Sequence, residues 1–293
     1  MTTTQYFTEL ISAQQLSSAL AIENSPHNII LLDASIPPVG CNSQYTPRWP
    51  CVTINNAQRF DLENDFSDSS SHYPHTMPSI EQFTKQVQQL GINTDSQVVV
   101  YDEQGIFSSA RAWWMFKAMG HKNVAILNGG LPLWIKLGLP TVERAASDEL
   151  QPDVTRGNFI ANYDKTAFCD RFQVADNIKT QQKKLLDARG IGRFSGDVED
   201  PRANVRAGHI PNAIHCHYAQ FLSQGCLLPV AELKRILLTK VNIDDDLILS
   251  CGSGVTACIL LLVAQLSGFN KVTVYDGSWS EWGAINHLPI ELS

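Results

Sequence analysis

One cysteine combines the features of a reactive thiol. Cys251 directly follows the apolar run 247–250, and Gly252 and Gly254 come just after it, ahead of a helical pattern. Functional sites in open parallel sheets form at the carboxyl ends of strands. Glycines let successive backbone N–H groups turn inward, and such a nest beside a helix N-terminus favours an anion. The anion here would be the Cys251 thiolate, which is the nucleophilic form of cysteine.

The alternative reading of Cys251 is a buried structural thiol, because free cysteine is among the residue types most often buried. A core thiol, however, does not need two glycines beside it. The sequence around Cys251 therefore favours a nucleophile.

Short apolar runs alternate with helical patterns around this loop. Residues 185–188, 247–250 and 272–275 are predicted to be strands, and residues 230–238 and 256–266 are predicted to be helices. Such alternation is typical of parallel β-α-β units. We therefore expect Cys251 to lie at the carboxyl edge of a parallel sheet.

The chain also contains two copies of one unit. The run LLDAS at 31–35 recurs as LLDAR at 185–189. Four further residues recur at a constant offset, as Gly120, Val124, Gly129 and Trp134 and again as Gly268, Val272, Gly277 and Trp282. A repeat of this length indicates two duplicated domains, because solenoid repeats have periods of ~20–50 residues. We place the boundary near Thr141 to Thr155, between domains at 1–145 and 160–293.

The composition of the chain limits the classes of protein to which it can belong. The chain has 293 residues, of which 44% are hydrophobic, and 22 basic and 29 acidic residues give a net charge of −7. This composition excludes a disordered chain and argues against broad binding of nucleic acid or an anionic membrane. No apolar run approaches the ~20 residues that a membrane span needs.

The seven cysteines are expected to be reduced. Their number is odd, no Cys-x-x-Cys occurs, and the first ten residues show neither a basic nor an apolar run. Without a sign of export or of a zinc site, we predict free thiols and a cytoplasmic protein.

The residues 251–256, with the sequence CGSGVT, resemble the active-site loop of the 3-mercaptopyruvate sulfurtransferases in the rhodanese superfamily. The resemblance covers nearly the whole chain, including DAR at 187–189, GRF at 192–194, GHIPNA at 208–213 and YDGSWSEW at 275–282. It implies an α/β fold of two tandem rhodanese-like domains, each a mainly parallel sheet flanked by helices. The first domain would be inactive and the second would carry the Cys251 loop.

The resemblance also assigns site residues. The catalytic group would comprise Cys251, Ser253, His75 and Glu63, and the substrate-binding group Arg193, Arg202, Gly252, Gly254, Val255 and Thr256. Glu63 stands where the family usually has Asp in a proposed Asp–His–Ser relay. The alternative for His75 is a surface histidine in a polar loop, and for the two arginines a pairing with nearby acidic residues. No metal or cofactor is implied.

The first domain has Asp102 at the position that matches Cys251. A carboxylate cannot carry sulfane sulfur, so this half is expected to be inert. In the second half Ala257 stands where rhodanese-fold phosphatases need an arginine, which makes phosphate-ester hydrolysis improbable.

The implied reaction moves sulfane sulfur from 3-mercaptopyruvate through a Cys251 persulfide to an acceptor such as cyanide, a thiol or thioredoxin, and releases pyruvate. Arginine suits the carboxylate of this 2-oxo acid. One alternative is a thiosulfate:cyanide sulfurtransferase, whose loop would carry basic residues where this loop has Gly252 and Ser253. Another is a persulfide-carrying docking module with little turnover.

Overall fold

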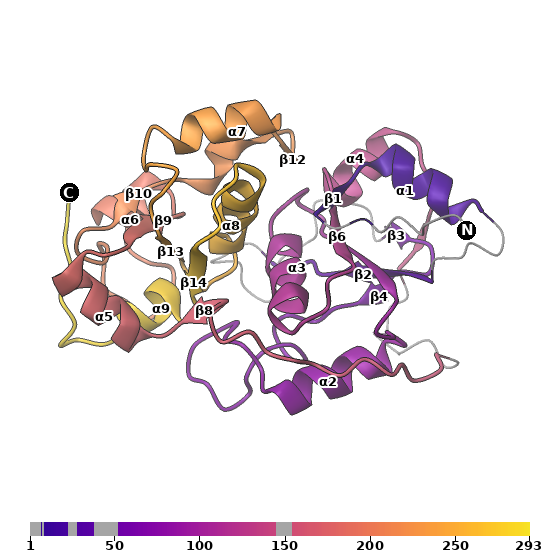
Figure 1. The fold of residues 1–293 in the computed structure, drawn as a ribbon, viewed down its shortest axis with the longest axis horizontal. Coiled ribbons are helices and arrows are strands. Elements are labelled where there is room, and N and C mark those ends of the chain that lie inside the picture. Colours follow the sequence, from indigo (N-terminus) through magenta and orange to yellow (C-terminus); the bar gives the residue numbers. More distant parts are fainter. Residues whose placement is uncertain (1–6, 8, 23–27, 38–51, 145–153) are drawn as a thin grey trace.

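Two five-stranded parallel sheets frame the molecule, one in each half of the chain (Figure 1). The computed structural model describes residues 7, 9–22, 28–37, 52–144 and 154–293. The first sheet has the order β1 (Leu10–Ile11), β6 (Val124–Leu127), β5 (Gln97–Tyr101), β2 (Ile29–Asp33), β4 (Gln58–Arg59). The second has the order β8 (Phe168–Cys169), β14 (Val272–Tyr275), β13 (Leu247–Ser250), β9 (Lys184–Asp187), β10 (Ile214–His215). The matching orders confirm the predicted duplication and fold class.

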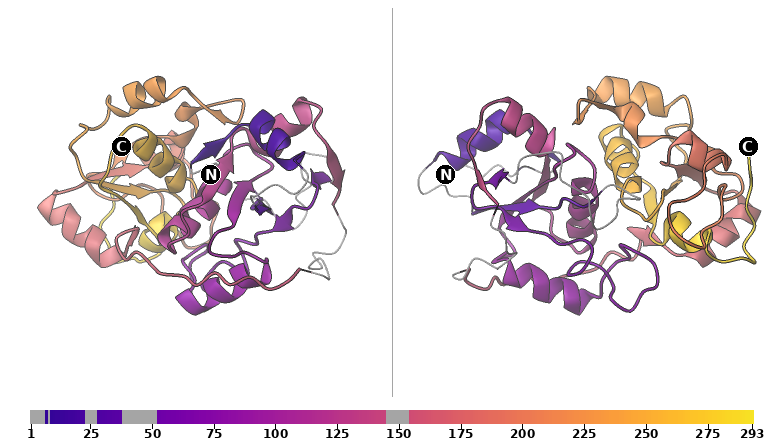
Figure 2. Two further views of the ribbon diagram at one scale, coloured as in Figure 1. Left: turned by 45° about the vertical axis from the view of Figure 1, so that its right-hand side comes forward. Right: turned by 180° about the vertical axis from the view of Figure 1, so that it is seen from behind.

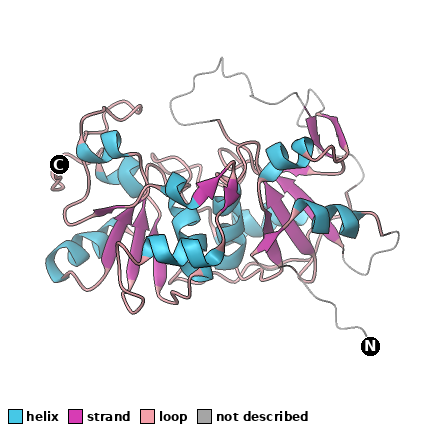
Figure 3. Ribbon diagram, turned by 90° about the horizontal axis from the view of Figure 1, so that it is seen from above, coloured by secondary structure: helices cyan, strands magenta, loops and turns pink. Residues whose placement is uncertain are grey.

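Helices flank both sheets (Figure 3). The first half contains α1 (Ala13–Leu20), α2 (Ile80–Gln89), α3 (Ser109–Ala118) and α4 (Gly130–Lys136). The second contains α5 (Arg171–Thr180), α6 (Ile191–Ser195), the short η1 (Tyr218–Phe221), α7 (Val230–Leu237), α8 (Ala257–Leu266) and α9 (Ser278–Trp282). Two small antiparallel pairs join β3 (Val52–Ile54) to β7 (Thr141–Glu143) and β11 (Leu222–Ser223) to β12 (Cys226–Leu227).

The strands are apolar on both faces because both faces are covered. Along β5, Val98 and Val100 belong to the central core, whereas Val99 and Tyr101 belong to a core on the opposite face. This is the pattern of a parallel sheet enclosed by helices. The central core continues from one half into the other through α3 and α8, which lie side by side between the two sheets (Figures 1 and 2). The two halves are therefore packed tightly against each other.

The same hydrogen bond is found near the end of each half. The indole N–H of Trp134 donates to the carbonyl of Pro140, and that of Trp282 donates to the carbonyl of Pro289, each at 2.8 Å. A buried tryptophan needs such a partner for its N–H. The tryptophans that recur in the two halves of the sequence therefore share a structural role.

The segment between the halves stays close to the first one. Strand β7 pairs with β3, so residues 141–143 belong to the first half rather than to a linker. Residues 145–153 lie outside the described part. Beyond them, Gly157 N–H donates to the Gln88 carbonyl at 2.8 Å and Asn162 N–H to the Met119 carbonyl at 2.9 Å. The domain limits of 1–145 and 160–293 remain predictions.

Among the described residues, no helix is long and apolar enough to cross a membrane.

Candidate active site

A cavity of about 650 Å³ opens between the two halves and is lined by both. The first half contributes Ile36, Pro37, Glu63, Pro74, His75, Gln104 and Phe107. The second contributes Arg193, Val198, Glu199, Pro201, Arg202, Tyr218, Cys251, Gly252, Ser253, Val255 and Thr256. All the predicted site residues except Gly254 therefore lie in the wall of one cavity.

The Cys251 loop has the predicted local structure. Strand β13 ends at Ser250, the thiol of Cys251 follows with the residue only 1% exposed, and α8 begins at Ala257. Within the described chain, none of the backbone N–H groups from Gly252 to Thr256 donates a hydrogen bond to the protein. Such a run of free donors in front of a helix favours an anion.

The loop is supported from behind by the residues that follow β14. The N–H of Cys251 donates to the Ser278 hydroxyl at 3.2 Å, and the N–H of Ser280 donates to the Gly252 carbonyl at 2.8 Å. Gly254 has φ +75, and a Cβ there would lie 2.9 Å from the Asp276 carbonyl. Gly254 therefore acts through the backbone: it permits the turn and does not line the cavity.

The two predicted arginines lie beside the nucleophile. A Cβ placed on Gly252 would be 3.3 Å from both terminal nitrogens of Arg202 and 3.7 Å from Nη1 of Arg193. Arg202 also pairs with Asp200 at 3.1 Å, so the expected alternative partner is present as well. In the described part of the chain, the Arg193 guanidinium makes no ion pair or hydrogen bond. Its donors can serve a ligand.

A third arginine is structural. Arg189 is 1% exposed, and its Nη2 donates to Asp187 Oδ2 at 2.7 Å and to the Gly208 carbonyl at 2.8 Å. These bonds hold the turn that leads from β9 to α6, the helix that carries Arg193. Arg189 thus supports the backbone that carries Arg193 and does not itself line the cavity.

His75 and Ser253 come together across the two halves. His75 Nδ1 and Ser253 Oγ are 2.9 Å apart, at hydrogen-bond distance. His75 has φ +61, a left-handed conformation that costs a non-glycine residue ~1 kcal/mol. Burial first, and then the charges of Arg111 and Arg202, lower the pKa of His75 to about 4. The ring is therefore neutral at pH 7.

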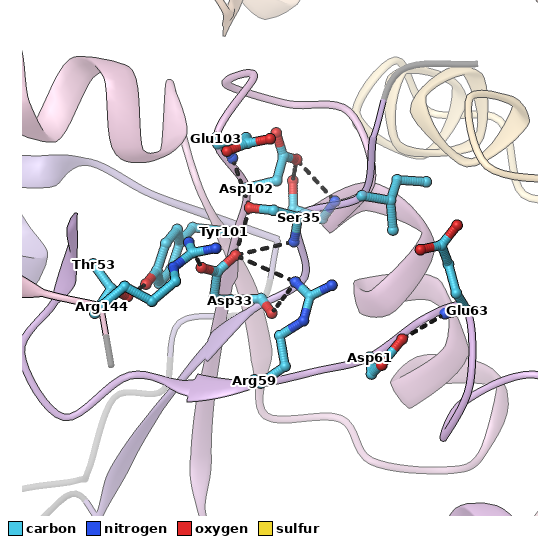
Figure 4. Close-up of polar contacts among 12 residues, drawn as sticks. Asp33, Ser35, Thr53, Arg59, Asp61, Glu63, Tyr101, Asp102, Glu103 and Arg144 are labelled. Carbon is cyan, nitrogen blue, oxygen red and sulfur yellow. Dashed lines mark hydrogen bonds and ion pairs between the residues drawn. The ribbon is translucent and has the colours of Figure 1, made fainter. Parts of the chain in front are cut away.

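Glu63 lines the same cavity, but its position differs from that of a relay acid. In the described structure, the Glu63 carboxylate makes no hydrogen bond to His75, and its backbone N–H donates to Asp61 Oδ1 at 2.9 Å (Figure 4). The structure thus brings together the Ser253 and His75 part of the predicted relay and leaves the Glu63 part a prediction.

The lowered pKa of His75 can be tested by titration. We expect an NMR titration of its ring protons to have a midpoint near 4, well below the ordinary 6.5. Because folding lowers this pKa, the unfolded chain binds the proton more readily. The contribution of His75 to stability is therefore present above about pH 6.5 and lost as the pH falls through about 4. A midpoint near 6.5 would contradict the buried, neutral assignment.

The loop that matches Cys251 in the first half is closed by its own carboxylate. Asp102 accepts hydrogen bonds from the N–H groups of Gln104, Phe107 and Ser109 at 2.8, 2.8 and 2.9 Å, and from the Ser109 hydroxyl at 2.6 Å. Gly105 has φ +107 at the position of Gly254, so the two loops share a turn. The N–H groups of Gln104 and Phe107, which correspond to the free donors of Ser253 and Thr256, are thus occupied by Asp102, which supports an inert first half.

The first half also holds its Asp33 differently from Asp187. The Asp33 carboxylate accepts from the N–H and hydroxyl of Ser35 and pairs with Arg59 and Arg144 (Figure 4). Separate arginines thus replace the one that Asp187 finds two residues away in Arg189.

Replacing Asp102 by Cys is expected to create no second nucleophile. Asp102→Cys removes an acceptor of four buried hydrogen bonds, so we expect a loss of ~2–3 kcal/mol in unfolding free energy and an inert thiol. The test uses a Cys251→Ser background and mass spectrometry after exposure to a sulfur donor. Added sulfur on residue 102 would refute it.

Sequence reasoning missed several residues of the site. Gln104 and Phe107 line the cavity from the supposedly idle loop, and Tyr218 lines it from η1. Arg111 and Asp276 lie just behind the cavity and join the two halves at 2.7 Å. Arg111 did have a signal, because it is the one charge in the otherwise uncharged run 109–116.

Comparison with known proteins agrees with this geometry. A family model described as Rhodanese-like domain matches residues 50–137 and 172–285, and the chain belongs to this family. The mouse 3-mercaptopyruvate sulfurtransferase is 35% identical over 290 residues, covering 96% of this chain and 94% of the relative. The chicken thiosulfate sulfurtransferase is 36% identical over 280 residues, covering 93% and 92%.

A solved structure extends the likeness to the fold. The crystal structure of SseA from Escherichia coli, described with the rhodanese fold of 3-mercaptopyruvate sulfotransferases, gives a TM-score of 0.80 at 32% identity, covering 93% of this chain and 99% of that one. The chain is therefore an enzyme of the sulfurtransferase type that these relatives represent.

Proposed function

We propose that this enzyme takes sulfur from 3-mercaptopyruvate through a persulfide on Cys251 and passes it to a thiophilic acceptor. The observation that carries the proposal is the placement of Arg193 and Arg202 against Gly252, directly beside the nucleophile. Two forked cations at this point suit a small 2-oxo acid, whose carboxylate and carbonyl oxygen both accept hydrogen bonds. The mouse and Escherichia coli relatives named for this donor support the same choice.

In the first step, the Cys251 thiolate attacks the sulfur of 3-mercaptopyruvate. An S–S bond forms, the C–S bond breaks, and its electron pair passes into the 2-oxo acid as an enolate. The proton that was on the donor thiol ends on that carbon, which gives pyruvate and leaves an anionic persulfide. Arg193 and Arg202 stabilise the charge that develops on the carbonyl oxygen. The free N–H groups of the loop stabilise the persulfide.

Ser253 and His75 would transfer the proton that leaves the donor thiol in this step. The Ser253 hydroxyl lies two residues from the nucleophile and at 2.9 Å from a neutral imidazole, which can accept a proton at one ring nitrogen. In the second step the acceptor removes the outer sulfur and restores the thiolate. Cyanide, a small thiol or reduced thioredoxin is the acceptor we propose, and the cytoplasm is the proposed location.

Thiosulfate is the second candidate donor. The same free N–H groups and the two arginines provide positive potential for a dianion, and the chicken relative is named for this donor. The loop itself carries no basic side chain between Cys251 and Thr256, which favours the singly charged donor. We therefore expect thiosulfate as a weaker substrate.

The test compares the two donors on the purified enzyme. Pyruvate release from 3-mercaptopyruvate and thiocyanate formation from thiosulfate are measured with cyanide as the acceptor, and kcat/KM is obtained for each donor. A higher value for 3-mercaptopyruvate supports the proposal. A higher value for thiosulfate establishes the alternative, and a stable persulfide without pyruvate release indicates a carrier module.

A further inference from the structure

The side chain of Arg111 crosses from the first half to the second. It projects from α3, is fully buried, and lies over the ring of Phe168 at 4.6 Å. Its Nη2 donates to the His75 carbonyl at 2.6 Å and to Asp276 Oδ1 at 2.7 Å. One nitrogen thus ties the backbone of His75 to the end of β14 in the other half.

The partner carboxylate holds the same backbone at a second point. Asp276 Oδ2 accepts from the N–H of Met77 at 2.8 Å. The left-handed residue His75, with φ +61, therefore has its carbonyl bonded to Arg111, and the N–H two residues later is bonded to Asp276. A conformation that is costly for a non-glycine residue persists where its surroundings fix it.

The pair also reaches the loop of the nucleophile. A Cβ on Gly254 would lie 3.1 Å from Nη1 of Arg111 and 2.9 Å from the Asp276 carbonyl. Arg111 and Asp276 thus contact the segment that carries His75 on one side and the segment that carries Ser253 on the other. Neither residue lines the cavity, so neither contacts a substrate there.

We propose that Arg111 and Asp276 are a positioning pair that sets His75 against Ser253 only when the two halves are docked. The proposal deepens the proposed function, because it assigns to the interface the geometry of the proton-handling step. It predicts that removing either member of the pair weakens the His75–Ser253 contact while each sheet remains folded.

The charged groups around His75 give the proposal a second consequence, which concerns the pKa of this residue. The groups around His75 are Arg111 behind it, Arg202 and Arg193 across the cavity, Glu63 on its own half and the Cys251 thiol. Burial and the two cations Arg111 and Arg202 lower the pKa of His75. Removing the Arg111 charge should therefore raise that pKa, and removing Glu63 should leave it lower or unchanged.

The experiment is a double-mutant cycle of Arg111→Met and His75→Ala on the full chain. We expect Arg111→Met to lower kcat for 3-mercaptopyruvate by ~10- to 100-fold with little change in KM, because it misplaces a group used in the transition state. His75→Ala should then cost less in the Arg111→Met background than in the parent, since the interaction is already lost. Arg111→Lys should restore part of the rate.

Lys136→Met is the matched control. Lys136 Nζ donates to Gln224 Oε1 at 3.0 Å and also bridges the two halves, but it does not contact the His75 segment. It should leave kcat within ~2-fold of the parent, as is usual for an exposed polar contact. Additive losses in the cycle, or an equal loss in Lys136→Met, would overturn the proposal.

Two further measurements keep the test decisive. If Arg111→Met does not fold, Asp276→Asn replaces it in the same cycle with the same expected coupling. In Arg111→Met the NMR-detected pKa of His75 should rise above about 4, because a cation that lowers it is removed, whereas Asp276→Asn removes a carboxylate and should not raise it. The pKa measurement does not depend on pyruvate release. A parent enzyme that releases no pyruvate would refute the proposed function. An unchanged pKa of His75 in Arg111→Met would refute the positioning pair.

Discussion

Cys251→Ser is expected to abolish sulfur transfer, with a loss of at least ~1000-fold in kcat for either donor. The serine oxygen occupies nearly the same volume, so the loop, whose backbone bonds to Ser278 and Ser280 do not involve the thiol, should stay in place. A serine hydroxyl remains protonated at neutral pH and cannot form a persulfide. Rates of pyruvate release and mass spectrometry of the donor-treated protein measure the effect.

Cys258→Ser is the matched control for this change. Cys258 lies in the same segment and is fully buried, and its thiol donates to the Gly254 carbonyl at 3.2 Å. Burial raises the pKa of Cys258 to about 12, so it is a neutral thiol and not a nucleophile. Its replacement should leave kcat nearly unchanged. More than a few per cent of activity in Cys251→Ser would move the nucleophile to another residue.

Arg193→Ala and Arg202→Ala are expected to lower kcat/KM for 3-mercaptopyruvate by ~10- to 1000-fold each, corresponding to ~1.5–4 kcal/mol of charge-assisted hydrogen bonding. Both guanidiniums lie against Gly252, so each is within reach of a donor whose sulfur meets Cys251. Thiosulfate lacks the 2-oxo acid group and should lose less. Arg202→Ala also releases Asp200, so Arg193→Ala is the cleaner of the two variants.

Comparing the activity losses with the two donors distinguishes two roles for Arg193 and Arg202. Equal losses with 3-mercaptopyruvate and thiosulfate would mean that the arginines support the loop and do not recognise the carboxylate. Arg189→Ala provides the contrast, because it breaks the bonds to Asp187 and Gly208 and should reduce stability and both activities together. Introducing a basic side chain at Gly252 is a poor test, since its Cβ would already meet Arg202 at 3.3 Å.

Much of the fold could be predicted because the sequence repeats itself. The strands at 247–250 and 272–275 were predicted with the bounds they have, and the helices predicted at 230–238 and 256–266 match α7 and α8 within one residue. Apolar runs bounded by turn residues define such buried strands locally. The Cys251 loop was also predictable from a local pattern, because its glycines adjoin the nucleophile in the sequence.

The residues that sequence reasoning missed act over long separations. Arg111 meets His75 and Asp276, and Gln104 reaches the cavity from a loop without a nucleophile. No local pattern records which distant carboxylate a buried arginine will find, because the docking of the halves decides it. Glu63 shows the converse: a residue in the right stretch of sequence lies in the cavity wall without bonding His75.

The Asp102 loop, which is closed by its own carboxylate, has a consequence for the Cys251 loop in the other half. Its carboxylate oxygens stand three bonds from Cα, as the outer sulfur of a cysteine persulfide does. The first half therefore shows how this turn binds a terminal acceptor atom, with the N–H groups two and five residues further on as donors. The corresponding donors beside Cys251 belong to Ser253 and Thr256. In this respect the Asp102 loop resembles the persulfide that we propose for Cys251.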